Sequence, residues 1–311
     1  MRLHVERVTD DAEWDDLVEA SASGTLFHSS LWTASSPFSF LRIGCRLAGN
    51  LIGGLVLQVN DTMGCLGTLA PYLGPIILEM HPKMCSALQY NVQNELADAS
   101  QLYVSRPTFF TSPWGGNLQP FITAGFEAKL LYTSVVDISD LSMAEDRHAD
   151  NLRRNMLAAI KDGLTVEHSD NCDELLCLVS KTFERQNQEI WFNLEECETV
   201  VSALIRKKRA AVFLARNAEG KAVAGVGIVW DKRRSYYILG GYDHADAHRG
   251  ATSLNLWEAM RFTALTLRLT EFDLEGSYVP AIARFFRQFG GAWLPFYYMK
   301  QSSRPLIDLE E

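Results

Sequence analysis

The chain has 311 residues, of which 47% are hydrophobic and 22% are charged, with a formal net charge of −9 and a pI of about 5.3. This length suits one large domain or two of ordinary size, and the composition is typical of a globular protein rather than a disordered one. The negative charge argues against a general nucleic-acid binder, whose affinity comes mainly from basic groups that neutralise phosphates.

No run of about 18 apolar residues indicates a membrane span, and the N-terminal residues lack the apolar core of a signal peptide. The six cysteines form no C-x-x-C pair and have no zinc spacing, so we expect no metal site. We interpret them as reduced packing residues of a cytoplasmic protein. They are Cys45, Cys65, Cys85, Cys172, Cys177 and Cys197.

The first half of the chain alternates predicted helices and strands. Residues 12–21 have helical spacing, with Trp14, Leu17 and Val18 on one face. Residues 40–59 predict a hairpin that turns at Gly49 and Asn50. The other expected elements are strands at 3–8, 101–107 and 129–138 and helices at 82–100 and 119–126.

The second half follows a similar plan. A helix is expected at 148–163, and three antiparallel strands are expected within 210–243, turning at Glu219–Gly220 and at Lys232–Arg233. The other expected elements are helices at 172–188, 194–208 and 279–291, a helix that begins in the loop after residue 243, and strands at 164–169, 270–277 and 293–301.

Two stretches of the first half recur in the second. GNLIGGLVL, which begins at Gly49, aligns with GKAVAGVGI, which begins at Gly220, so that Gly54 matches Gly225. FITAGFEAKLLY later aligns with FRQFGGAWLPFY in the same order. We interpret the chain as two copies of one α/β unit that join near residues 140–150. A chance similarity between hairpins is the alternative.

The loop DHADAHRGATSLNLWEA, residues 243–259, lies between a predicted strand and a predicted helix. A helix N-terminus presents unpaired N–H groups and a partial positive charge, which together bind phosphate. Gly250 would let the backbone approach a ligand, Arg249 would add a charged donor, and Thr252 and Ser253 could cap the helix or donate hydroxyls. The predicted phosphate-binding residues are Arg249, Gly250, Ala251, Thr252 and Ser253. An ordinary strand–helix turn is the alternative.

Acid–base catalysis needs proton donors and acceptors, and polar side chains at strand ends are candidates for these roles. Asp273 and Glu275 are two residues apart, so on a strand they would share one face. They could bind an amine or act as a base, and a solvated strand edge is the alternative. Tyr242 and Tyr278 could donate a proton or bind substrate, although packing with a satisfied hydroxyl explains lone tyrosines equally well.

A basic cluster on the helix at 148–163 comprises Arg153, Arg154 and Lys161. It could face an anionic acceptor, or it could be a solvated face balanced by Asp150 and Asp162. The basic runs at 206–209 and 232–234 could touch tRNA phosphates, or they could be ordinary surface turns.

The order of elements between residues 212 and 300 resembles the Gcn5-related N-acyltransferase (GNAT) fold. IARFFRQFGG, from residue 282, looks like the late helix of that family. LRRNMLAAIKDGLTVE, SKTFERQN, YYILGGYD and FDLEGSYVPAIARFFRQFGG are together similar to the Fem-type aminoacyltransferases and their acyltransferase relatives, which carry two such domains in one chain.

The resemblance implies a mixed α/β fold of two tandem GNAT-like domains, each a twisted sheet flanked by helices: residues 1–145 on the acceptor side and 146–311 on the donor side. It implies an N-acyltransferase in which the splayed ends of two middle strands face the acyl group. The stretches at 27–37 and 70–78 resemble acceptor domains, so Trp32 and Tyr72 are expected to bind substrate with Arg153, Arg154 and Lys161.

The resemblance also implies the reaction partners. The loop at 243–259 would hold a donor phosphate, but Ala247 and Thr252 depart from the usual acyl-CoA pattern, which suits an aminoacyl-tRNA donor. We expect acyl-CoA or aminoacyl-tRNA as co-substrate and no tightly bound cofactor. Among nucleic acids, tRNA is a candidate partner and DNA is not. The expected acceptor is an amine on a cell-wall precursor or a polysaccharide-type sugar. The alternative is a catalytically inactive binding protein with the same fold.

Overall fold

The computed structural model describes residues 2–59, 69–78, 85–104, 106–190, 192–246, 248–276 and 279–301. By its contacts the chain divides into two compact units, Met1–Leu131 with Pro295–Glu311, and Tyr132–Leu294. In the described part of the chain, none of the helices combines the length and the apolar character that crossing a bilayer requires.

The first unit contains a four-stranded antiparallel sheet with the order β1-β2-β3-β4. Its first helix begins after Asp10, whose carboxylate accepts a hydrogen bond from the Glu13 amide, and it buries Trp14, Leu17 and Val18 as predicted. The elements are β1 (Leu3–Arg7), α1 (Asp11–Ala20), η1 (Leu26–His28), α2 (Ser30–Ser35), β2 (Phe40–Leu47), β3 (Asn50–Gln58), β4 (Pro75–Ile77), α3 (Cys85–Tyr103), β5 (Thr108–Phe110), α4 (Gln119–Thr123) and the start of β6 (Phe126–Asp137).

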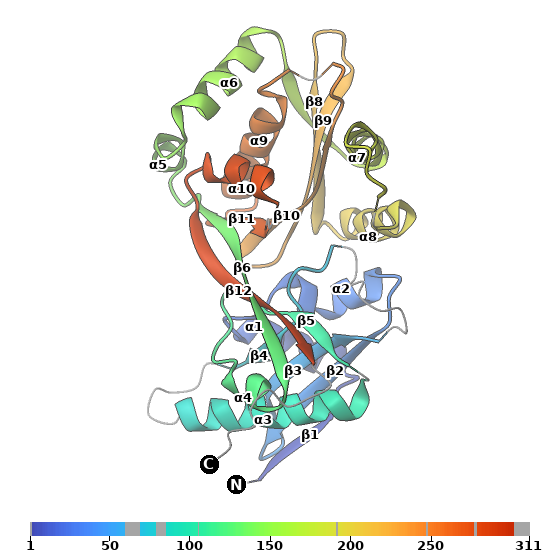
Figure 1. Ribbon diagram of the computed structural model, residues 1–311, viewed down its shortest axis with the longest axis vertical. Coiled ribbons are helices and arrows are strands. Elements are labelled where there is room, and N and C mark those ends of the chain that lie inside the picture. Colours follow the sequence, from blue (N-terminus) through green and yellow to red (C-terminus); the bar gives the residue numbers. More distant parts are fainter. Residues whose placement is uncertain are drawn as a thin grey trace. The chain divides into compact units, whose positions relative to one another are not determined.

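The second unit contains strands in the order β6-β11-β10-β9-β8-β7, in which β10 and β11 are parallel. Helices α7 and α8 cover one face of this sheet and α9 covers the other (Figure 1). The elements are α5 (Leu141–Asp146), α6 (Asp150–Lys161), β7 (Thr165–Ser169), α7 (Asp173–Arg185), α8 (Leu194–Arg206), β8 (Ala210–Arg216), β9 (Ala222–Trp230), β10 (Arg234–Tyr242), α9 (Ala251–Leu265), β11 (Glu271–Gly276), α10 (Pro280–Arg287) and the start of β12 (Ala292–Gln301).

The two units exchange their last strands. β6 follows the helices of the first unit, yet its end at Thr133–Asp137 pairs with β11 of the second. β12 follows the helices of the second unit, yet Tyr298–Lys300 pair with β5 of the first. The expected division at residue 145 therefore differs from the observed one, because strand pairing places residues 132–145 and the last strand with the opposite unit.

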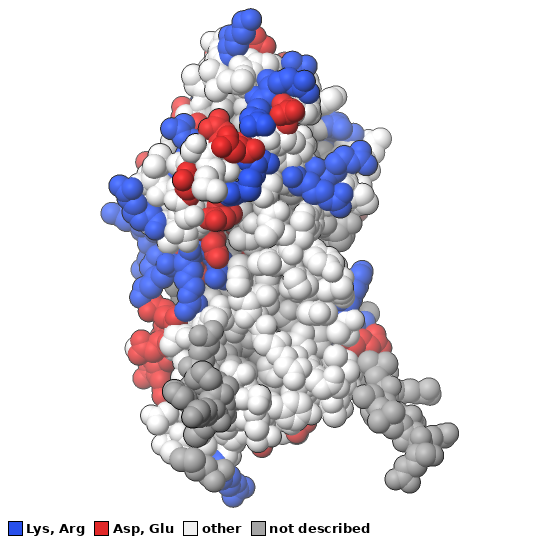
Figure 2. Space-filling view, turned by 90° about the vertical axis from the view of Figure 1, so that its left-hand side faces the viewer, with Lys and Arg blue, Asp and Glu red and all other residues white. Residues whose placement is uncertain are grey.

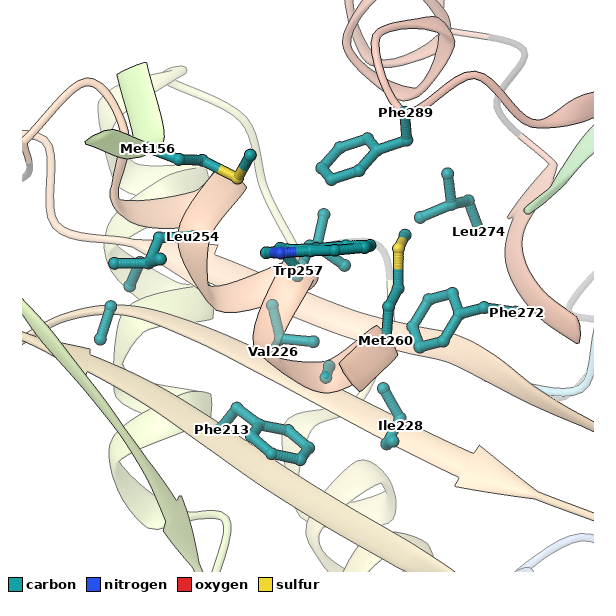
Figure 3. Close-up of a cluster of buried hydrophobic side chains, with 14 of the residues drawn as sticks. Met156, Phe213, Val226, Ile228, Leu254, Trp257, Met260, Phe272, Leu274 and Phe289 are labelled. Carbon is teal, nitrogen blue, oxygen red and sulfur yellow. The ribbon is translucent and has the colours of Figure 1, made fainter. Parts of the chain in front are cut away.

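One apolar cluster organises the second unit. Figure 3 shows Trp257 of α9 among Met156 of α6, Met260 of α9 and Phe289, which follows α10. Phe272 and Leu274 of β11 belong to the same cluster and are fully buried. Burying each such side chain contributes about 1.5–3 kcal/mol, so the cluster fixes α9 and β11, which carry several candidate site residues.

Most expected elements are confirmed, and one is wrong. The residues 101–107 were expected to form a strand, but α3 continues to Tyr103 and the strand begins at Thr108. Pro107 has no N–H to give to a sheet, so a strand begins more readily after it than it ends there. The short elements α2, β4 and α5 were not expected, because three to six residues carry little periodic signal.

Candidate active site

The parallel strands β10 and β11 separate after three paired residues. Arg234, Ser235 and Tyr236 pair with Glu271, Phe272 and Asp273, and no later residues of the two strands pair. Both strands are irregular at this point: β10 shifts its register with β9 between Tyr237 and Leu239, and β11 shifts its register with β6 between Asp273 and Gly276. Bulges of this kind redirect side chains next to functional sites.

Asp273 has a structural position at this divergence. It is fully buried, and its Oδ1 accepts hydrogen bonds from Thr133 Oγ1 at 2.5 Å and from the Glu275 amide at 2.8 Å. In the second bond the aspartate side chain accepts from the backbone amide two residues later, which forms a local turn. Asp273 therefore stabilises the bulge, which is a structural role beside the amine-binding or base role that the two-residue spacing predicted.

Glu275 carries the unusual carboxylate of this site. Its backbone lies in the left-handed region at φ 58°, and its Oε1 is buried without a hydrogen-bond partner among the described residues. Burial, reinforced by the charge of Asp273, raises the pKa of Glu275 well above its usual range. A carboxyl group whose pKa is raised binds a proton more tightly than an exposed carboxylate does, which is a property of many general bases.

Tyr237 is a site residue that the sequence did not single out. Burial raises the pKa of its hydroxyl, and the charge of Glu275 adds to that shift. Its ring packs edge-on against Phe286 of α10 with centroids 5.8 Å apart. Its hydroxyl lies 1.9 Å from where a Cβ on Gly240 would stand, so the glycine leaves room for it. The pattern YYILGGY predicted only a strand and did not distinguish Tyr237 from its neighbours; the register shift of β10 lies directly after Tyr237.

The predicted phosphate loop begins with a buried aspartate that two lysines contact. Asp243 is 6% exposed, and Lys181 and Lys221 contact its carboxylate at 2.7 and 3.0 Å. These lysines lower the pKa of Asp243 to about 2, and Lys221 also pairs with Asp246. Both lysines therefore already neutralise carboxylates of the loop.

Gly250 has a packing role at the start of α9. A Cβ there would lie 2.0 Å from the backbone oxygen of Asn155, so glycine is required by the close approach of α6. The Gly250 amide donates to His248 Nδ1 at 3.0 Å, and His248 Nε2 lies 3.1 Å from Asp162. The described residues contain no group of three or more His, Cys, Asp or Glu placed to hold a metal ion.

The other predicted loop residues line the first turn of α9. Gly250 is the N-cap and no side chain caps the helix, so Thr252 and Ser253 do not act as caps. Ala251 and Ser253 are buried, whereas Arg249 is exposed. Arg249 is therefore the loop's accessible cation, while Ala247 lies outside the described residues.

The basic cluster on α6 is accessible. Arg154 and Lys161 are exposed, and Arg153 contacts Asp150 at 2.9 Å. On the face that Figure 2 displays, Lys and Arg side chains gather over the second unit, interspersed with Asp and Glu. This mixture suits a solvated surface as well as an anion-binding one.

The remaining predicted site residues are dispersed. Tyr242 ends β10, where the Arg185 guanidinium stacks over its ring at 5.3 Å, and Tyr278 lies outside the described residues. Trp32 and Tyr72 are 1% and 0% exposed within an aromatic cluster of the first unit around Phe27. Because they are buried, they pack against neighbouring side chains and present no exposed surface to a substrate.

Known proteins were compared with this chain in three ways. Residues 146–295 match the family model described as an acetyltransferase (GNAT) domain. A search of curated proteins finds no match.

Several solved structures have a similar fold. FemX superposes with a TM-score of 0.71 at 15% identity, covering 96% of this chain and 97% of that chain. The C-terminal domain of a putative lysylphosphatidylglycerol synthetase from Agrobacterium fabrum gives a TM-score of 0.60 at 16% identity, covering 94% and 91%. A tandem GNAT protein from the clavulanic acid biosynthesis pathway gives 0.57 at 12% identity, covering 97% and 100%.

At sequence identities of 12–16%, the solved structures show a shared fold. The family model identifies residues 146–295 as a GNAT domain. The mixed α/β architecture with two sheets is that of FemX and of tandem GNAT proteins, as the sequence order suggested. Residues 146–295 match the acetyltransferase (GNAT) domain model, and the similar solved structures extend the shared fold over nearly the whole chain.

Proposed function

We propose that this protein is an N-acyltransferase that moves an aminoacyl or acyl group from a tRNA or CoA donor to an amine. The observation that carries the proposal is Glu275, which has a buried carboxylate oxygen without a described partner where β10 and β11 separate. Buried polar groups are nearly always hydrogen-bonded, so such an atom is a strong indication of a site where a substrate group binds.

The proposed reaction needs a proton acceptor and a proton donor. The acceptor amine attacks the carbonyl carbon of the donor, a C–N bond forms, and Glu275 takes the proton that the nitrogen releases. The C–S or C–O bond to the donor then breaks, and its sulfur or oxygen leaves with a proton. Tyr237, whose raised pKa keeps its hydroxyl protonated, is the donor we propose for that step.

A tandem GNAT protein among the solved structures with a similar fold supports acyl transfer, whereas the acceptor class is our proposal. FemX, a lysylphosphatidylglycerol synthetase domain and a tandem GNAT protein share the fold. We propose an amine of a cell-wall precursor or a polysaccharide-type sugar as acceptor. The exposed residues Arg249, Arg153, Arg154 and Lys161 are the proposed contacts for anionic parts of the donor and acceptor.

The test measures transfer directly. The purified chain is incubated with labelled acyl-CoAs or aminoacyl-tRNAs and with amino sugars or peptidoglycan precursors, and amide products are detected by mass spectrometry. Glu275→Gln keeps the shape of the side chain and should slow transfer by about 10²-fold or more. Glu198→Gln, on the exposed face of α8, is the matched control and should transfer normally. Equal rates for wild type and Glu275→Gln would refute the role of Glu275.

A second candidate is a non-catalytic binding protein. The loop at 243–250 favours it, because the contacts of Lys181 and Lys221 with Asp243 and the packing of Gly250 against α6 give this loop structural roles. Saturable binding of a donor without any amide product from wild-type protein would support this reading. The binding assay should use Arg249→Ser, since an added side chain at Gly250 would disturb α6 whatever the ligand.

A further inference from the structure

The second unit carries a basic pocket at the opposite end of the diverging strands. The pocket, of about 280 Å³, is lined among the described residues by Leu269 and by polar side chains from two segments that meet where β10 and β11 begin. The polar lining residues are Lys232, Arg233, Arg234, Arg268, Thr270 and Glu271. Four cations and one carboxylate line this space in a chain whose formal net charge is −9.

A buried arginine forms one wall of the pocket. The Arg234 side chain is 6% exposed, and its Nε donates to Glu271 Oε2 at 2.8 Å. The single carboxylate of the lining is therefore already engaged by one of its cations. Removing a guanidinium from water costs free energy, and the ion pair with Glu271 offsets part of that cost.

The turn before β10 is held in a fixed shape. Asp231 Oδ1 accepts from the amides of Arg233 and Arg234 at 2.7 and 3.0 Å, and Asp231 Oδ2 accepts from the Tyr236 hydroxyl at 2.6 Å. A turn fixed by its own aspartate presents Lys232 and Arg233 with little conformational freedom to lose on binding, which favours affinity.

Arg268 closes the pocket from the other segment. It lies three residues beyond α9, is exposed, and adopts the left-handed φ of 60°. That conformation costs a non-glycine residue roughly 1–2 kcal/mol. No ion pair of Arg268 is found among the described residues, so its guanidinium is available to a ligand.

We propose that this pocket binds the phosphate or diphosphate group of a small molecule. Guanidinium groups match phosphate oxygens through paired hydrogen bonds, lysine adds a point charge, and the Thr270 hydroxyl can donate a further bond. A polynucleotide would need an extended basic groove, whereas this pocket has roughly the volume of a small ligand site. The site goes beyond the proposed acyl transfer and does not depend on it.

Calorimetric titration of the full chain with inorganic pyrophosphate and with inorganic phosphate tests the site. Wild type should bind pyrophosphate saturably, and added salt should weaken the binding. The double variant Lys232→Ser/Arg268→Ser should weaken it about tenfold or more, as expected when charged hydrogen bonds are lost. Both positions are exposed, so folding should persist, which circular dichroism checks.

Two single-charge variants locate the anion. Arg206→Ser, at the end of α8, removes one positive charge elsewhere and should bind as wild type does. Arg249 is a proposed donor contact, so its variant serves to locate the anion. Loss of binding in Arg249→Ser with retention in the double variant would move the anion to the start of α9 and overturn the proposal. Absence of saturable binding to wild type would overturn it as well, leaving these cations to complement the C-terminal end of α9. Because the readout is binding, the result is separate from any failure of acyl transfer.

Discussion

The two units treat a buried ionisable side chain in opposite ways. In the first, His28 is fully buried, and both ring nitrogens are paired: Nδ1 accepts from the Thr25 amide at 3.2 Å, and Nε2 donates to the Gly74 carbonyl at 3.0 Å. In the second, Glu275 has a buried oxygen with no described partner. A satisfied buried group stabilises the fold, whereas an unsatisfied one costs stability and marks the unit where chemistry is expected.

The units otherwise share their plan. Each has a hairpin that turns at a glycine with positive φ, Gly49 at 87° and Gly220 at 80°. Each also places a glycine under a helix, since a Cβ at Gly54 would meet Trp14 of α1 and a Cβ at Gly225 would meet Leu175 of α7. The aligned glycines of the two sequence repeats therefore have matching structural roles, and the units differ mainly where β10 and β11 separate.

The largest expected effect distinguishes Glu275 from Asp273, both on β11. Glu275→Gln should lower transfer by about 10²-fold or more and leave the fold intact. Since the folded pKa of Glu275 is raised, wild type loses stability as pH rises from the usual carboxyl range towards that pKa, and the variant should lack this fall.

Asp273→Asn is the contrasting variant. It should destabilise the protein by about 1–3 kcal/mol, because the buried bonds from Thr133 and the Glu275 amide lose their charged acceptor. Urea unfolding between pH 5 and pH 9 measures both variants. The assigned roles would be wrong if Glu275→Gln lowered the free energy of unfolding more than Asp273→Asn does.

The next prediction compares a buried histidine in each unit. His28→Phe should cost about 2–4 kcal/mol, because it leaves the Thr25 amide and the Gly74 carbonyl without partners. His148 is also buried, but neither ring nitrogen has a partner among the described residues, and its ring packs edge-on against Trp257 and Phe289. His148→Phe should therefore be close to neutral, within about 1 kcal/mol.

Acid should destabilise the protein through the same two histidines. Burial lowers the pKa of both His28 and His148 to about 4. In mild acid these imidazoles are therefore protonated in the unfolded chain but remain neutral in the folded chain. Stability should be complete above about pH 6.5 and should fall as the pH drops towards 4, by at most about 3 kcal/mol for each histidine. Thermal unfolding at pH 7 and pH 5 checks this, and a wild-type stability that is flat across this interval would contradict it.

A smaller effect should distinguish the two glycines that lie under helices. A Cβ at Gly54 would lie 2.6 Å from the Trp14 ring, whose Nε1 is fixed by donating to the His28 carbonyl. A Cβ at Gly225 would lie 2.8 Å from a methyl group of Leu175, which can rotate. Gly54→Ala should cost about 2–3 kcal/mol and Gly225→Ala about 1 kcal/mol. Chemical denaturation should reveal this order, and the reverse order would show that the Leu175 pocket is the more rigid.

The smallest effect concerns the hairpin turns. Gly49→Ala and Gly220→Ala meet no atom within 4 Å, so only the left-handed backbone opposes the added methyl group. Each change should cost about 1 kcal/mol, equally in the two units. Differential scanning calorimetry of both variants would test this, and a clear difference between them would mean that the two turns are not equivalent.

Much of the fold could be predicted from the sequence because its signals are local. Trp14, Leu17 and Val18 form the buried face of α1, and the glycines at 49 and 220 mark the hairpin turns. The site was less predictable. Simple strand alternation placed Asp273 and Glu275 on one face, but the left-handed backbone at Glu275 broke that alternation and gave the two carboxylates different environments.

The sequence by itself determined the order of strands and helices, the repeated hairpins and the resemblance to tandem acyltransferases, because periodicity, turn residues and their order are written along the chain. Only the tertiary structure decided that β6 and β12 pair in opposite units, that Gly250 is required by α6, that Tyr237 lies near Glu275, and that a basic pocket forms from residues 232–234 and 268–271. These features depend on residues far apart in the sequence, whose contacts follow from packing and strand pairing rather than from local pattern.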